Sequence, residues 1–165
     1  MLTPKAVLDL AVDAWNSTNE EALLALATAD IDVTAPAGPS TRGRARLRSW
    51  LRIWTEAARD HRVRILSVAS APYQLIYEGL CEGTHTGVLR LPTGDIPPTG
   101  RTMVVGCTGL IRLTGDRISY LRHYLDMTAL AAQPAVRRTE GPEIRHYPFA
   151  EAAVQRAAVS VFRRS

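Results

Sequence analysis

The chain has 165 residues, of which 46% are hydrophobic and 22% are charged, as expected for one globular domain with a sizeable core. No apolar run reaches the ~18 residues of a membrane-spanning helix, and no basic segment leads into an apolar run at the N-terminus, so we expect neither membrane insertion nor a secretion signal. The net charge of +4 would permit an acidic partner, but aromatic residues are not interleaved with the arginines, and we expect no nucleic-acid binding.

Three helices are predicted in the first part of the chain. The first begins at Thr3, a capping residue followed by proline. The second begins at Thr18, whose spacing to Glu21 fits a capping box. The third, over residues 44–59, has an apolar stripe formed by Leu47, Trp50, Leu51 and Trp54. Its basic stripe, which we interpret as a solvated face, consists of Arg44, Arg48 and Arg52.

A short strand is predicted at 31–35, before the third helix, and the remaining strands follow that helix. A strand is expected at 63–70, and from Tyr73 to His85 the odd positions are mainly apolar or small, which indicates a one-sided strand that its glycines allow to bend. A strand over 102–113 turns at 114–116 into a last strand over 117–125. Three helices followed by antiparallel strands predict an α+β fold, with a curved sheet wrapped around helices and a pocket left inside.

The two cysteines, Cys81 and Cys107, fall inside strand patterns, so we expect buried thiols in a reducing cytoplasm rather than a disulfide. A nucleophilic Cys107 is disfavoured because no helix terminus beside it would lower the pKa of the thiol. After residue 133 the chain reads as a linker and then as a short amphipathic helix over 148–162. We therefore expect one domain over 1–133 and an extension over 134–165.

Three motifs carry a family resemblance: GTHTG at 83–87, PTGR at 98–101, and YLDM at 124–127 leading to Gln133. Together they resemble the SnoaL-like polyketide cyclases, whose fold is the α+β cone of nuclear transport factor 2. The resemblance implies a cofactor-free cytoplasmic homodimer of secondary metabolism that closes a ring, by an aldol-type or related reaction, in a polyketide-like intermediate. An epoxide-opening hydrolase or an isomerase on the same fold remains an alternative, as does a non-catalytic ligand-binding module.

The resemblance assigns general acid/base catalysis to Asp126, and the alternative is that this carboxylate caps a following helix. Asp126 shares strand parity with Tyr124, Arg122 and Tyr120, and an apolar pocket on that side would raise the pKa of the carboxyl group. His85 is either a catalytic partner in the pocket or a satisfied core histidine.

The remaining site predictions concern the pocket wall and metal ions. Trp15, Trp50, Trp54 and Tyr77 are expected to bind substrate together with Tyr124 and Arg122, in a cavity of roughly several hundred cubic ångströms. His123 has the opposite parity from Asp126 and is expected to face outward or to lie in an interface. No metal site is expected, because His85, His123 and Asp126 lack the short-range spacing of a zinc motif.

Overall fold

The structure is a computed structural model that describes residues 2–34, 40–91 and 94–126. The chain divides into two units, Met1–Ala135 and Val136–Ser165. The whole second unit, with the terminal helix predicted at 148–162, lies outside the described residues. None of the helices in the described ranges combines the length and the apolar character that a membrane-spanning helix needs.

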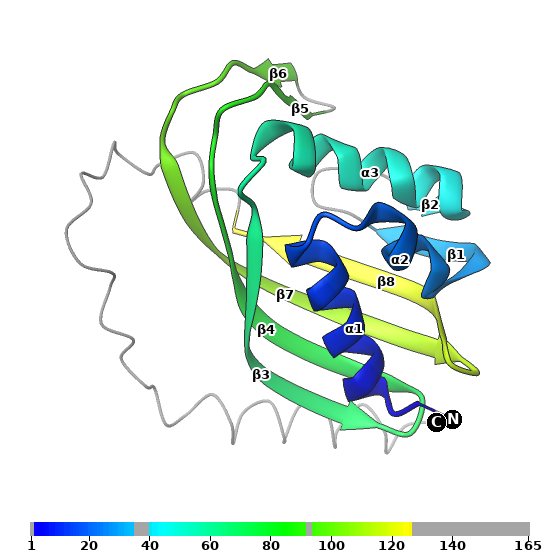
Figure 1. The fold of residues 1–165 in the computed structure, drawn as a ribbon. Coiled ribbons are helices and arrows are strands. Elements are labelled where there is room, and N and C mark those ends of the chain that lie inside the picture. The colour runs from blue at the N-terminus through cyan, green and yellow to red at the C-terminus, as the bar shows by residue number, and fades with distance from the viewer. Residues whose placement is uncertain (1, 35–39, 92–93, 127–165) are drawn as a thin grey trace. The chain divides into compact units, whose positions relative to one another are not determined.

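The first unit is an α+β fold, as predicted. Its described elements are α1 (Pro4–Asn16), α2 (Glu20–Ala25), β1 (Ala27–Thr34), β2 (Thr41–Arg42), α3 (Arg44–Ala57), β3 (Arg62–Ala71), β4 (Gln74–Thr84), β5 (Leu89–Leu91), β6 (Gly94–Ile96), β7 (Thr102–Thr114) and β8 (Arg117–Leu125). Within the described residues, six strands form one sheet in the order β2-β1-β8-β7-β4-β3, antiparallel except where β1 lies beside β8. The sheet curves around the helices, which lie on its concave side, and β5 and β6 form a separate hairpin (Figure 1).

The first two helices show one correct and one incorrect prediction of a cap. Thr3 caps α1, since its Oγ1 accepts a hydrogen bond from the backbone N–H of Ala6 at 3.2 Å. At α2 the cap is Asn19 rather than Thr18, and its side chain accepts from the N–H of Ala22 at 3.0 Å. Thr18 has a φ of 56° and forms part of the turn before the helix. The capping-box prediction is wrong, because the cap lies one residue later and the third helical residue is then Ala22, whose side chain cannot return the hydrogen bond.

Two arginines of the basic stripe of α3 form ion pairs with α2. Arg48 and Arg52 each place Nε at 2.9 Å from a carboxylate oxygen of Glu20. The hydrogen bond from Arg52 is the main reason that the pKa of Glu20 lies below its usual value. On the opposite face Leu47 and Leu51 are buried in the core. The pairing orients the apolar stripe of α3, with its tryptophans, toward the sheet.

The alternation predicted for β4 is confirmed, because Leu75 and Tyr77 are buried on the inner face while Glu78 is exposed. Leu75 packs in a core with Ile111 of β7 and Val7 of α1, each no more than 3% exposed.

The last strand, β8, changes side at a β-bulge. Leu113 pairs with Ile118 and Arg112 pairs with Tyr120, so Ser119 has no partner in the ladder with β7. An extra residue of this kind inverts the alternation of side chains, because successive residues of a strand face opposite sides of the sheet. Ile118 is buried in the core before the bulge. Beyond it, the inward positions of β8 are Leu121, His123 and Leu125.

Candidate functional site

Two adjoining cavities lie between the helices and the inner face of the sheet. The first encloses about 120 Å³ and the second about 80 Å³. Four residues line both: Trp15, Trp50, Cys81 and His123. Tyr77 lines the first cavity and Trp54 the second, so the three tryptophans and Tyr77 lie where the sequence placed them, and their binding of substrate stays a prediction. The predicted volume of several hundred cubic ångströms is wrong, since it exceeds what either cavity encloses.

A row of residues across three strands brings Tyr77 to His123. Tyr77 of β4 pairs with Gly109 of β7, and Gly109 pairs with His123 of β8. A Cβ atom at position 109 would overlap the ring of Tyr77, so glycine leaves the room in which the phenol crosses β7. The phenol oxygen lies 2.6 Å from Nδ1 of His123. The other ring nitrogen, Nε2, faces Sγ of Cys81 at 3.9 Å.

Burial keeps these polar groups uncharged. It lowers the pKa of His123 to about 4, so the imidazole is neutral at pH 7. Burial also raises the pKa of Tyr77, and the Cys107 and Cys81 thiols nearby raise it further. A hydrogen bond with the thiol of Cys107, together with burial, raises the pKa of Cys81. The cavity wall therefore presents neutral hydrogen-bonding groups rather than an ion pair.

His61 holds Trp15 in the wall of the second cavity. Its Nδ1 lies 2.9 Å from the carbonyl oxygen of Ala58, and its Nε2 lies 3.0 Å from the carbonyl oxygen of Trp15. The rings of His61 and Trp15 meet edge to face, with centroids 4.5 Å apart. The sequence gives no partner for His61, because both contacts are with backbone atoms that the fold brings near.

The prediction that Asp126, Arg122 and Tyr124 face the pocket is wrong. Tyr124 is 48% exposed, the other two are exposed, and none of them lines either cavity. The reason is the bulge at Ser119, since an unbroken alternation would have turned all three inward. The same bulge turns His123 inward, against the prediction. Asp126 directly follows the inward position 125, and its catalytic role stays a prediction.

His85 lies in the core and outside the lining of both cavities. It is 2% exposed, and its Nδ1 lies 3.1 Å from Oγ1 of Thr99. Its backbone N–H donates to the carbonyl of Arg101, and its own carbonyl accepts from the N–H of Gly100. Among the described residues its Nε2 has no partner. His85 is therefore a core histidine with one ring nitrogen unsatisfied within the described structure, and its catalytic role stays a prediction.

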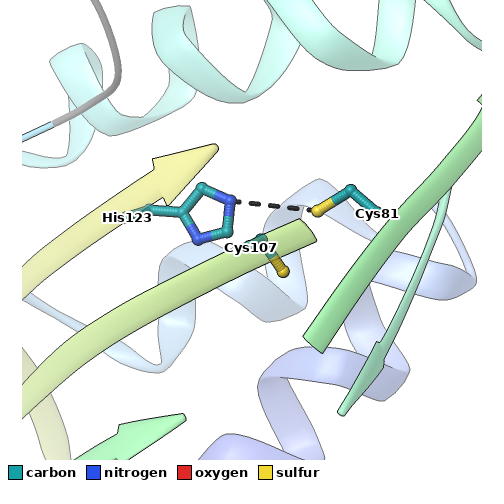
Figure 2. A group of neighbouring side chains, drawn as sticks. All are labelled: Cys81, Cys107 and His123. Atoms are coloured by element: carbon teal, nitrogen blue, oxygen red, sulfur yellow. Dashed lines mark hydrogen bonds between the residues drawn. The ribbon is translucent and has the colours of Figure 1, made fainter. Parts of the chain in front are cut away.

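The inner face of the sheet brings Cys81, Cys107 and His123 together. Their ligand-type atoms lie within 4.8 Å of one another, and Figure 2 shows Cys81 and His123 directed toward each other with Cys107 nearby. Strand register explains this cluster, because Cys107 pairs both with Gly79, two residues before Cys81, and with Leu125, two residues after His123. A search for short-range metal motifs misses such a set. The sequence did contain one indication of this cluster, since each of three strand patterns carries a residue that can bind a metal ion.

The fold and the cavity define the class of the protein. Helices on the concave side of a curved sheet, with a cavity between them, make the α+β cone of the nuclear transport factor 2-like proteins. A model of the SnoaL-like domain matches residues 9–121, more than half of the chain. The chain therefore belongs to the SnoaL-like domain family. No curated protein sequence matches it.

Solved structures show the same fold at low sequence identity. IdmH from Streptomyces antibioticus, a proposed polyketide cyclase, has a TM-score of 0.68 and 19% identity, covering 79% of this chain and 97% of its own. A Catenulispora acidiphila protein with a ketosteroid isomerase-like fold, solved with trimethylamine, has a TM-score of 0.65 and 23% identity. The match covers 84% of this chain and 100% of that protein. A Mycobacterium tuberculosis LEH-like epoxide hydrolase has a TM-score of 0.58 and 14% identity. The match covers 76% of this chain and 84% of that protein. The named activities differ, so the shared fold does not identify the reaction.

Proposed function

We propose that the protein is an enzyme of the cyclase or isomerase type that acts on a polyketide-like small molecule without a cofactor. The observation that carries the proposal is the hydrogen bond between Tyr77 and His123 in the wall of an otherwise apolar cavity. Family membership supports the class of reaction. A proton-transfer group held in place beside the substrate cavity is one requirement of acid/base catalysis at carbon.

His123 is the proposed proton carrier. In the tautomer with the proton on Nδ1, that N–H donates to the Tyr77 oxygen and Nε2 keeps its lone pair. Nε2 takes a proton from the carbon beside a substrate carbonyl, and the resulting enolate carbon attacks a second carbonyl and forms the new C–C bond. The imidazolium returns its proton to the alkoxide that this attack creates. No atom or electron is left over, which is consistent with a cofactor-free ring closure.

Two buried N–H donors support a carbonyl-bearing ligand. Within the described residues, Nε1 of Trp50 and Nε1 of Trp54 are buried and have no hydrogen-bond acceptor. Buried indole N–H groups normally find a partner, and an unpaired one costs about 1–3 kcal/mol. Both tryptophans line the second cavity, where a substrate carbonyl would supply the acceptor. A donor at that oxygen would also stabilise the developing enolate.

The cavity volumes restrict the ligand. A cavity of about 150 Å³ holds one benzene ring, and the larger cavity here encloses about 120 Å³. A polyketide-like molecule would therefore have to extend through both cavities, past Trp15 and Trp50, which line each of them. We propose a substrate with one small ring or an open chain rather than a preformed polycyclic system.

Single substitutions test the proposal with a poly-β-keto ester as the probe. His123→Asn should lower turnover by about 10²–10⁴-fold while ester binding persists, because only the proton carrier is lost. Asp126→Asn tests the rival assignment on the same strand, and we expect it to change turnover less than ~10-fold. Turnover that survives His123→Asn and collapses in Asp126→Asn would return the catalytic role to the aspartate.

A ligand-binding protein without catalysis is the second candidate. The exposure of Asp126 favours it, since the carboxylate that the family resemblance assigns to catalysis lies outside both cavities. Unpaired indole donors would serve binding equally well. Saturable binding of the ester by the wild-type chain, without any product, would support this candidate and refute the enzyme.

A further inference from the structure

We infer that Cys81, Cys107 and His123 form a binding site for a thiophilic divalent ion, best suited to zinc, with one coordination position open to the cavities. The inference goes beyond the proposed reaction and does not depend on it. Its basis is that the three side chains come from three strands, β4, β7 and β8, and converge on the same face of the sheet (Figure 2).

The distances suit a tetrahedral ion. With Zn–S bonds of about 2.3 Å and a Zn–N bond of about 2.0–2.1 Å, a sulfur and a nitrogen ligand lie roughly 3.6 Å apart and two sulfurs roughly 3.8 Å apart. Sγ of Cys81 and Nε2 of His123 are separated by 3.9 Å, and all three ligand atoms lie within 4.8 Å. The atoms need to approach one another by no more than about 1 Å, which small side-chain rotations provide.

The surroundings already orient the histidine as metal sites do. A metal-bound imidazole usually has its second nitrogen held by a hydrogen bond, which fixes the ring and its tautomer. Here the Tyr77 oxygen holds Nδ1 of His123 at 2.6 Å, so Nε2 is the nitrogen that faces the thiols. The ligands stand on adjacent strands, β4, β7 and β8, which keep their backbones in register.

Charge balance favours an ion of charge +2 at this place. Two thiolates, a neutral imidazole and one zinc ion have no net charge, so the complex avoids the cost of burying a charge in an apolar wall. The two thiols release two protons to solvent as two S–Zn bonds form, and affinity should rise with pH. Sulfur and imidazole ligands exclude magnesium and calcium, which require oxygen ligands.

The open position distinguishes the site from a structural zinc site. Structural sites have four protein ligands, whereas three ligands and a free position are typical of sites that bind a substrate or water. Cys81 and His123 line both cavities, so the free position faces them. The ion would also occupy Nε2, the atom proposed above as proton acceptor. Metal loading should therefore suppress the proposed turnover, and chelation should restore it.

Cobalt(II) provides an optical test that needs no substrate. The full-length chain, reduced and stripped of metal, should bind one cobalt ion, with thiolate-to-metal charge-transfer absorption and the visible bands of a tetrahedral site, and zinc should displace it. Cys81→Ser and Cys107→Ser should each weaken the charge-transfer absorption. Tyr77→Phe keeps all three ligands and should weaken binding by about 10–100-fold. His85→Asn, which removes a buried histidine outside the cluster, should bind like wild type.

Two results would overturn the inference. One is a reduced wild-type chain that shows no charge-transfer absorption with cobalt. The other is a cobalt spectrum unchanged in both serine variants, which would place the ion elsewhere. If a serine variant fails to fold, the other serine variant and Tyr77→Phe still decide, and zinc-dependent melting temperatures identify which chains are folded and loaded. Failure to turn over any substrate would refute the proposed function and leave this site unaffected.

Discussion

The phenol oxygen of Tyr77 lies 2.6 Å from Nδ1 of His123, although the strands that carry these residues are not neighbours in the sheet. The strand between them, β7, contributes Gly109, over which the phenol passes. The hydrogen bond between Tyr77 and His123 therefore depends on the absence of a side chain at Gly109 of β7.

Gly109→Ala should displace the phenol of Tyr77, because the added Cβ overlaps its ring. We expect a loss of about 1–3 kcal/mol in the free energy of unfolding, as for other overpacked cores, and a changed imidazole environment for His123 in NMR spectra. Gly106→Ala is the matched control on the same strand, since no heavy atom lies within 4 Å of a Cβ there. Equal melting temperatures for the two variants would contradict the crossing role of Gly109.

Trp54→Phe should separate binding from stability. It removes a buried N–H that has no acceptor in the described structure, so stability should stay the same or rise slightly. If a ligand carbonyl accepts from this N–H, the affinity for a keto ester should fall about 5–15-fold, equivalent to about 1–1.5 kcal/mol. A hydrocarbon ligand of similar size should bind both chains alike. Unchanged ester affinity would remove Trp54 from the set of carbonyl donors.

Asp60 should make stability depend on acid pH. Its carboxylate accepts hydrogen bonds from the backbone N–H and from Oγ1 of Thr84, both at 2.7 Å, and these lower its pKa in the folded state. The unfolded carboxyl group titrates near pH ~3.9, so the stabilisation is fully present above that value. It is lost as the pH falls through the lower folded-state pKa.

Melting curves between about pH 2 and pH 7 test this linkage. Asp60→Asn should melt below wild type at pH 7, and the difference should shrink at the acid end. Asp95→Asn, at an exposed aspartate of β6, controls for the change of charge alone. If the difference in melting temperature between Asp60→Asn and wild type stays constant with pH, then packing, rather than the ionised carboxylate, stabilises the contact between Asp60 and Thr84.

Regular local patterns were predictable from the sequence. The cap at Thr3 and the alternation along β4 follow from nearest neighbours, and the structure confirms both. The aromatic wall followed as well, because Trp50 and Trp54 share the apolar face of α3 with the buried Leu47.

The misplaced residues of β8 have a common cause in a single residue. Ser119 adds one position to β8, and nothing in its chemistry distinguishes it from an ordinary strand residue. The family resemblance placed the face of Asp126 toward the pocket, but beyond Ser119 the inward positions of β8 are the odd ones, so Asp126 lies outside both cavities and His123 lines them. The cluster of cysteines and histidine was hidden for a different reason, since only the pairing of β4, β7 and β8 brings those residues together.

The parallel pairing of β1 with β8 bears on how the molecule is made. Val33 of β1 pairs with Leu121 of β8, so the central ladder joins strands from opposite ends of the first unit. Contacts of such long sequence separation form slowly, because a large loop must close before they stabilise the chain. During synthesis, β1 can gain this partner only after β8 has emerged from the ribosome. Until then, the inner faces of β4 and β7 lack the strand that carries His123, and the nascent chain exposes apolar surface on which it could aggregate.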